Sequence, residues 1–175
     1  VYLSEQVHHC VMKAMRIIGL SDVIIRYIPL DAHHRMDVKA LKDQVVKDQN
    51  EKLNPFIIVA SAGTTDTGAI DPLGAIAGVA EENKLWFHVD AAYGGFFILS
   101  EEKKNKFEGI SRSDSLVIDP HKGLFLPYGL GTVLIKNADA VLKSHHYVAN
   151  YMEGAYEGAT TYSPADLSPE LTKHF

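Results

Sequence analysis

Hydrophobic residues occur in short continuous runs along the chain, separated by segments with a different spacing. The runs at 56–60, 85–89, 115–118 and 132–135 are mostly apolar and contain many β-branched or aromatic side chains. Runs of this kind are typical of strands that are buried on both faces of a parallel sheet. We therefore predict a strand in each run, and a further strand over residues 23–30.

Between these runs, apolar residues recur every three or four positions, as on one face of a helix. Asp37 predicts the cap of a helix over residues 38–53, because an Asp side chain can accept hydrogen bonds from a helix start. In the same way, Asp71 followed by Pro72 predicts the start of a helix that ends near Asn83.

Two further helices are predicted near the ends of the chain. Ser4 can cap a helix that continues to Ile18, and Gly19 can end it. A last helix is predicted over residues 138–146, followed by a mobile segment at 147–169 with two glycines, two prolines and four tyrosines.

Strands and helices that alternate at this spacing predict an α/β fold, with a mainly parallel sheet flanked by helices. The polar motifs of the chain come directly after strands. In open α/β sheets, ligands bind at the carboxyl ends of the strands, so we expect a binding site there.

Composition narrows the class of protein. The 175 residues fit one domain, and 46% hydrophobic with 22% charged residues is typical of a soluble globular protein. The net charge of −5 argues against nucleic acid as a partner, and no apolar run reaches the roughly 18–20 residues of a membrane span. The single cysteine, Cys10, excludes an internal disulfide and suits a reducing compartment such as the cytoplasm; we expect it to be a small packing residue.

Two polar residues follow predicted strands in apolar surroundings. Asp90 ends the run at 85–89, and Lys122 comes shortly after the run at 115–118, beside His121. Alone, such an Asp often only forms a turn, and most lysines lie solvated on the surface. Together, a buried carboxylate and a desolvated lysine are what a protein needs to hold pyridoxal phosphate (PLP). The lysine would bind the cofactor aldehyde, and the carboxylate its ring nitrogen.

Other polar residues allow two interpretations. His8, near the start of the first predicted helix, could stack on a ring or contact a substrate carboxylate, or could be a partly exposed side chain. Thr64 and Thr65 follow a strand and could serve as turn residues or as cofactor contacts. Six histidines form adjacent pairs: His8–His9, His33–His34 and His145–His146. Neighbouring side chains on a helix or strand point apart, so we predict no metal site.

These motifs together resemble those of the group II PLP-dependent decarboxylases, the family of aromatic-L-amino-acid decarboxylase. The resemblance covers essentially the whole chain and rests on Ser4-Glu5-Gln6-Val7-His8, Ala62-Gly63-Thr64-Thr65, His88-Val89-Asp90-Ala91-Ala92-Tyr93 and Pro120-His121-Lys122. The third segment is the most specific. The resemblance implies the fold of the aspartate-aminotransferase-like PLP enzymes, with residues 1–175 as an incomplete PLP-binding large domain.

The resemblance also implies roles for the matching residues. Lys122 would be the Schiff-base lysine, Asp90 would hold the pyridine nitrogen, and Ala92 would pack against the ring. His8 would stack on the ring and contact substrate. Thr65, rather than its neighbour, would contact the cofactor.

Three further positions follow from the same comparison. His121 would lie near the phosphate, and Tyr151 stands at about the place of the family's catalytic-loop tyrosine. Asp119 is expected at the cofactor where the family often has Asn, and a carboxylate near a phosphate would be repelled unless it were protonated or turned away. Gly123 stands where the family commonly has a bulky aromatic residue, which leaves substrate preference open.

The resemblance implies an internal fragment of the large domain, because the family's phosphate-binding turn would precede Val1 and its small domain would follow Phe175. The intact protein is expected to be a cytoplasmic homodimer that decarboxylates an L-amino acid, for which an aromatic one is a candidate. Tyr151 or His8 would return the proton to Cα. Two alternatives stay open: a retro-aldol carbon–carbon lyase of the sphingosine-phosphate-lyase type, and an inactive fragment that binds no cofactor.

Overall fold

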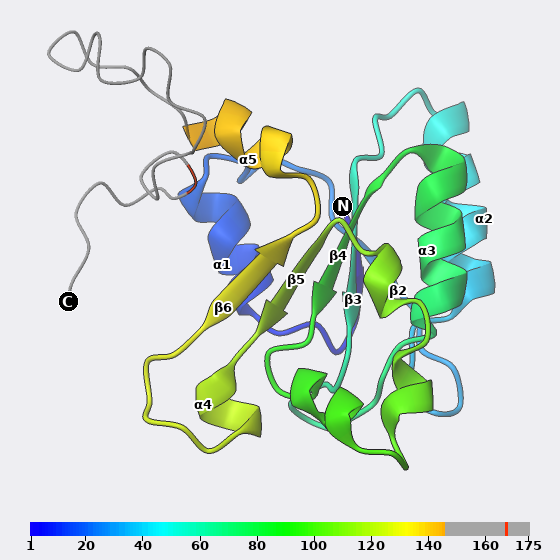
Figure 1. Ribbon diagram of the computed structural model, residues 1–175. Helices are drawn as coiled ribbons and strands as arrows, with labels where there is room; N and C mark the ends of the chain where they lie inside the picture. The colour runs from blue at the N-terminus through cyan, green and yellow to red at the C-terminus, as the bar shows by residue number, and fades with distance from the viewer. Residues whose placement is uncertain (146–166, 168–175) are drawn as a thin grey trace, which may run out of the picture. The chain divides into compact units, whose positions relative to one another are not determined.

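The computed structural model describes residues 1–145 and residue 167, and it shows a six-stranded sheet with helices (Figure 1). The strands are β1 (Tyr2–Ser4), β2 (Arg26–Ile28), β3 (Ile57–Ser61), β4 (Trp86–Asp90), β5 (Ser115–Ile118) and β6 (Thr132–Ile135). The α-helices are α1 (Cys10–Ile17), α2 (Val38–Asn50), α3 (Leu73–Asn83), α4 (Pro120–Gly123) and α5 (Ala138–His145), and three short 3₁₀ helices are η1 (Gly95–Leu99), η2 (Lys104–Phe107) and η3 (Ile110–Arg112).

The strand order in the sheet is β2-β1-β3-β4-β5-β6. The pairs from β2 through β5 are all parallel, while β6 runs in the opposite direction to β5 (Figure 1). The prediction of an α/β fold with a mainly parallel sheet is therefore confirmed.

The chain forms two compact units, residues 1–134 and 135–175. The first contains β1 to β5, most of β6 and helices α1 to α4. The described part of the second contains α5. The assignment of residues 1–175 to one incomplete large domain stays a prediction.

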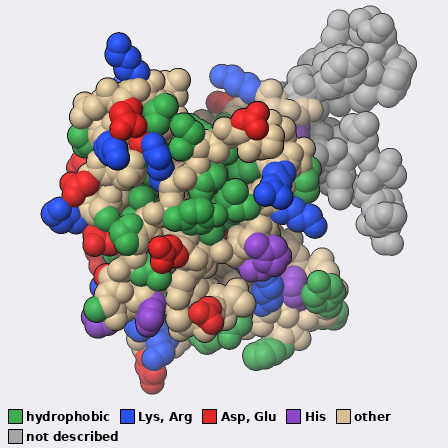
Figure 2. All heavy atoms as spheres, turned by 180° about the vertical axis from the view of Figure 1, so that it is seen from behind, with side chains coloured by type: hydrophobic (Ala, Val, Ile, Leu, Met, Phe, Trp, Pro, Cys, Tyr) green, Lys and Arg blue, Asp and Glu red, His purple; other side chains and the backbone are tan. Residues whose placement is uncertain are grey.

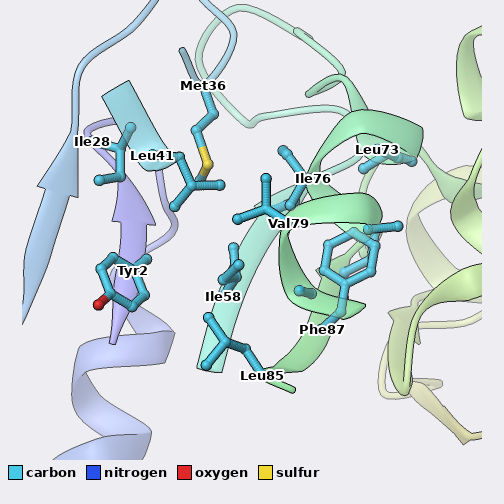
Figure 3. Packing of buried hydrophobic residues seen from close by; sticks show 14 of the residues in the cluster. Tyr2, Ile28, Met36, Leu41, Ile58, Leu73, Ile76, Val79, Leu85 and Phe87 are labelled. Carbon is cyan, nitrogen blue, oxygen red and sulfur yellow. The ribbon is translucent and has the colours of Figure 1, made fainter. Parts of the chain in front are cut away.

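The core has two layers because successive side chains of a strand point to opposite faces of the sheet. On one face, Tyr2, Ile58 and Phe87 pack with Leu41 of α2 and Ile76 of α3 (Figure 3). Apolar burial of this kind is the main driving force for the fold.

On the other face, the neighbouring strand residues Leu3 and Val59 form a smaller cluster with Met15 of α1. The sheet is therefore covered by α2 and α3 on one face and by α1 on the other (Figure 1). The smaller of these two layers holds the candidate site.

Two predicted helix signals are confirmed. The Asp37 side chain accepts hydrogen bonds from the backbone N–H groups of Lys39 and Ala40 at the start of α2. Gly19, with φ of 84°, follows the end of α1, and the N–H of the next residue, Leu20, donates to the carbonyl of Met15. A residue in the left-handed region is needed there, which favours glycine.

Two other helix signals are wrong. Ser4 does not cap α1, because it is the buried last residue of β1 and pairs with Ile28, so the helix begins only at Cys10. Asp71 does not cap α3 either. Its carboxylate instead accepts hydrogen bonds from the backbone of Met36 and Ser61, since tertiary partners take the oxygens that a cap would have used.

Some element boundaries also differ from those predicted. The strand expected over 23–30 is reduced to β2, and the helix expected over 38–53 ends at Asn50. The short helices η1 to η3 and α4 were not predicted. The described residues do not include His146 or, apart from Leu167, the segment 147–169. The predicted catalytic-loop residue Tyr151 belongs to that segment.

Candidate active site

A cavity of about 570 Å³ lies between α1 and the sheet, at the carboxyl ends of β3, β4 and β5. Its floor is made of alternate strand residues: Val59 and Ser61 of β3, His88 and Asp90 of β4, and Val117 of β5. These residues share one face because the register pairs Val59 with His88, and Asp90 with both Ser61 and Val117. The volume is typical of a site for a small molecule or cofactor.

The roof of the cavity is formed by α1 and the turn before it. Val11, Ala14, Met15 and Ile18 make this wall largely apolar. Cys10 also lines the cavity and is exposed, so the expectation of a small packing residue is wrong.

His8 lies at the entrance to α1 and lines the same cavity. Its Nδ1 accepts a hydrogen bond from the backbone N–H of Cys10 at 3.3 Å. The rings of His8 and His9 lie 4.1 Å apart, although adjacent side chains were expected to point apart. That expectation holds inside helices and strands, whereas this pair lies in the turn that precedes α1.

The Asp90 carboxylate is partly buried at the end of β4. One oxygen, Oδ1, accepts a hydrogen bond from the backbone N–H of Ala92 at 3.1 Å. This contact shapes the turn after the strand. Within the described residues it is the carboxylate's only hydrogen bond, so Oδ2 is available to a cationic group in the cavity.

Lys122 lies on the short helix α4, directly after β5. Its Nζ is 2.7 Å from Oδ2 of Asp119, and the two side chains are 40% and 17% exposed. Lys122 is therefore partly exposed and forms an ion pair with the mostly buried carboxylate of Asp119 at the edge of the cavity. The carboxylate of Asp119 is turned toward this lysine, which is one way to avoid the repulsion expected between Asp119 and a phosphate.

The two threonines of the Gly63 turn differ in their surroundings. The hydroxyl of Thr64 is buried and bonds to Gln6 at 3.2 Å and to Thr67 at 2.9 Å. Thr65 is exposed, lines the cavity and makes no side-chain hydrogen bond within the described part of the chain. Of the two, Thr65 has the hydroxyl that a ligand could use.

His121 lies outside the residues that line this cavity. Its Nδ1 is 2.6 Å from the carbonyl oxygen of Leu130, and its ring meets the ring of Tyr128 edge to face. A carbonyl only accepts, so Nδ1 carries the hydrogen of this bond. His121 thus holds the loop after α4, and its predicted place near a phosphate stays a prediction.

The sequence reasoning gave no role to His88, although it lines the cavity beside Asp90. His88 Nδ1 is 2.7 Å from the hydroxyl of Ser115, which also accepts a hydrogen bond from the indole N–H of Trp86 at 2.8 Å. Burial lowers the pKa of His88 below its usual value of 6.5, and the nearby Asp90 carboxylate opposes this shift. The alternation Trp86, His88, Asp90 along β4 would have been the signal for this residue.

The structure thus brings most of the predicted site residues to one cavity: His8, Thr65, Asp90, Ala92, Asp119 and Lys122. Among residues 1–145 and 167, no group of three or more His, Cys, Asp or Glu side chains is placed to hold a metal ion. None of the helices in that part of the chain is long and apolar enough to cross a membrane.

The chemistry of this set fits PLP. An amine, a carboxylate with one free oxygen, a free hydroxyl and a small side chain at Ala92 can serve an aldehyde, a ring nitrogen and a flat ring. Their individual roles toward the cofactor stay predictions.

Comparison with known proteins identifies decarboxylases, both by a family match and by individual relatives. Residues 1–167 match the family described as the pyridoxal-dependent decarboxylase conserved domain. The chain is 37% identical to an aromatic-L-amino-acid decarboxylase of Bacillus atrophaeus over 178 residues, which covers 100% of this chain and 37% of that protein. It is 36% identical to a cysteine sulfinic acid decarboxylase of Mus musculus, over 83% of this chain and 30% of that protein.

Among solved structures, the fold is similar to that of TDC from Oryza sativa with PLP and tryptamine, with a TM-score of 0.88 and 29% identity. The match covers 96% of this chain and 35% of that one. The chain therefore spans about a third of the length of the relatives that it matches.

Proposed function

We propose, because the chain belongs to the family of pyridoxal-dependent decarboxylases, that the protein containing it is a PLP-dependent carboxy-lyase that removes CO2 from an L-amino acid. One observation carries the proposal. The cavity between α1 and the sheet holds both the Asp90 carboxylate and the Lys122 amine, at the carboxyl ends of adjacent parallel strands.

When bound, PLP supplies a ring that accepts the negative charge left on the substrate as CO2 departs. Lys122 would hold the cofactor through its aldehyde, after its amine leaves Asp119. Asp90 would keep the ring nitrogen protonated, because an opposite charge favours the charged form of that nitrogen.

Three other residues would orient the cofactor and substrate. The imidazole of His8, held by the N–H of Cys10, would stack on the ring and meet the substrate. Ala92 would let the ring approach the backbone, and Thr65 would donate from its free hydroxyl. Each of these three lines the cavity.

A proton must return to the substrate Cα after CO2 leaves. Tyr151, which lies outside the described residues, is our candidate donor, with His8 as the alternative within the cavity. A donor placed in a segment that closes over the site would also exclude water from the reaction.

For the substrate, we propose aromatic L-amino acids as the first class to test. The relative aligned over all of this chain acts, by its name, on aromatic amino acids. The relative from mouse is named for an acidic substrate, cysteine sulfinic acid, so the choice between these two classes has to be measured.

We further propose that the intact protein is a homodimer of the cytoplasm. The loop after α4 supports the homodimer, because it exposes large apolar side chains. Phe125 and Tyr128 are each 93% exposed, and Leu124, Leu126 and Leu130 are also exposed. Hydrophobic side chains also gather in the middle of the face drawn in Figure 2. Exposed apolar groups of this kind mark surfaces that bind a partner. Sedimentation at several protein concentrations tests the homodimer.

The test of the proposed function uses the full-length protein supplied with PLP. We expect a visible absorption band that borohydride abolishes, and release of CO2 with the matching amine from one of a panel of aromatic and acidic L-amino acids. Absence of the band would refute cofactor binding. Release of an aldehyde without CO2 would instead favour the carbon–carbon lyase.

A further inference from the structure

The short helices η1 and α4 follow neighbouring strands and lie in close contact through glycine residues. A Cβ atom added to Gly123, the last residue of α4, would lie 2.9 Å from Cβ and 3.0 Å from Cδ2 of Phe96 in η1. A Cβ atom added to Gly95, the first residue of η1, would lie 2.8 Å from Cδ1 of Ile118, which ends β5. Carbon atoms in contact lie about 3.5–4.0 Å apart, so neither position has room for a side chain.

Gly123 is a glycine for reasons of space. It has a helical backbone, which any residue can adopt. Apart from its own helix, the three atoms nearest to the added Cβ all belong to the side chain of Phe96, which is half-buried. One of them is the Cβ of Phe96, which can withdraw only if the backbone of η1 moves. A bulky residue at position 123, as is common in the family, would therefore collide with Phe96.

The turn after β3 in turn holds η1. A Cβ atom added to Gly94, directly before η1, would lie 2.8 Å from Cα of Gly63, in the turn that carries Thr65. The backbone N–H of Gly95 also donates to the carbonyl of Ala91 at 2.8 Å. Since η1 has close contacts with this turn as well as with α4, it can serve as a fixed support for α4.

The position of α4 decides where the Lys122 amine lies. The side chain of Lys122 is 40% exposed and pairs with Asp119, the residue that precedes α4, and the backbone N–H groups of Lys122 and Gly123 donate to the carbonyl of Asp119. These contacts join Lys122 to its own helical turn. The turn is joined to the segment after β4 at its start, where the N–H of Asp119 donates to the carbonyl of Ala92 at 3.3 Å, and at its end by Phe96.

We propose that Phe96 is a positioning residue for Lys122. By packing on Gly123, it holds the turn of α4 so that the lysine amine stays at the cavity that Asp90 and Ala92 also line. Because α4 has only four residues, a shift at Gly123 also moves Lys122. The inference rests on the proposed function, in which this lysine binds the cofactor aldehyde.

The experiment tests whether positions 96 and 123 are coupled, in the full-length protein. Gly123→Ala adds a methyl group at the contact, and Phe96→Gly removes the three atoms that this methyl group would meet. The two substitutions are made singly and together. Phe97→Gly is the matched control, because Phe97 lies in the same short helix and is 51% exposed.

Two rates are measured for each variant. Hydrogen exchange of the Lys122 and Gly123 amides, in the absence of PLP, reports how firmly α4 is held. The rate at which the visible band forms after mixing with PLP reports how well the lysine amine is placed, and circular dichroism checks that each variant is folded. A role of Phe96 in overall stability alone would lower the urea midpoint but leave the rate of band formation in the folded protein unchanged.

We expect Gly123→Ala to speed the exchange of both amides and to slow band formation, each about tenfold, because overpacking is unfavourable. In the Phe96→Gly background, the same substitution should change either rate by less than about twofold, since the atoms that it would meet are gone. Phe96→Gly alone should change both rates about tenfold, because a half-buried aromatic contact is lost, and Phe97→Gly should stay within about twofold of wild type. An effect of Gly123→Ala that is equal in the two backgrounds would overturn the proposal.

A milder variant guards against misfolding of Phe96→Gly. Phe96→Ala keeps the Cβ atom and hence the 2.9 Å contact, so Gly123→Ala should still be unfavourable in this background, but less so than in wild type. Wild-type rates in Phe96→Ala itself would also overturn the proposal. If wild type formed no PLP band at all, the proposed function would fail and this role of Phe96 with it, whereas a normal wild-type band with unchanged variants would refute the role of Phe96 alone.

Discussion

Asp71 connects the loop before α2 to the end of β3, and its removal should loosen both. The residue is 2% exposed, and its two carboxylate oxygens accept hydrogen bonds from the backbone N–H groups of Met36 and Ser61, each at 2.7 Å. The backbone N–H of Asp71 also donates to the carbonyl of Ser61 at 2.9 Å. Since Ser61 lines the cavity, this contact supports the floor of the candidate site.

Replacing Asp71 with Ala leaves two buried N–H groups without an acceptor. Each unpaired buried group costs about 1–3 kcal/mol, so Asp71→Ala should lower the free energy of unfolding by roughly 2–6 kcal/mol. Asp71→Asn keeps one acceptor oxygen and should lose about half as much.

Urea unfolding of the full-length protein, followed by circular dichroism, measures this loss. Hydrogen exchange should show faster exchange of the Met36 and Ser61 amides in Asp71→Ala. Asp66→Ala is the matched control, since Asp66 is exposed in the same turn and its replacement should change stability by less than about 0.5 kcal/mol. A loss below about 1 kcal/mol in Asp71→Ala would show that these hydrogen bonds are easily replaced by water.

Three further predictions concern the candidate site. Asp90→Asn should lower turnover at least about a hundredfold and weaken PLP binding, as expected for one preorganised electrostatic group; near-normal decarboxylation would show that Asp90 only shapes the turn. Tyr151→Phe should lower turnover strongly while PLP binding and KM stay nearly unchanged, and a fast Tyr151→Phe beside an inactive Tyr147→Phe would place the donor at Tyr147. Burial lowers the pKa of His88 below 6.5, so its contribution to stability is present above pH 6.5 and is lost as the pH falls through the lowered value. Wild type should therefore lose more stability than His88→Gln between pH 7.5 and 5, in urea unfolding at both pH values, and equal losses would contradict this.

The strands of the sheet could be predicted from the sequence because their signal is local. The apolar runs that became β3 and β4 lie within one residue of their predicted places, and those of β5 and β6 coincide with them. A strand buried on both faces needs apolar residues throughout, whereas elements with one face in solvent alternate apolar and polar residues.

The ends of helices were harder to predict because polar side chains can find distant partners. Ser4 continues β1, since it pairs with Ile28 of the parallel strand β2, and Asp71 bonds to segments that lie 10 and 35 residues away in sequence. In contrast, within the part of the chain that the structure describes, the Asp37 side chain bonds only to the start of α2, which it caps as predicted.

The same distinction applies to the site. Asp90 and Lys122 could be identified because each follows a strand, and parallel strands bring such residues to one edge of the sheet. The ion pair of Lys122 with Asp119 and the contact of His88 with Ser115 could not, because they depend on side-chain direction and on the register between β4 and β5.

The most direct test of the account is to find the lysine that holds PLP. The full-length protein is loaded with PLP, reduced with borohydride, digested, and mapped by mass spectrometry. We predict that the cofactor is attached to the peptide containing Lys122, and that Lys122→Ala loses both this label and the visible band. Labelling of a different lysine in wild type, with the band retained in Lys122→Ala, would contradict the assignment of this cavity as the PLP site.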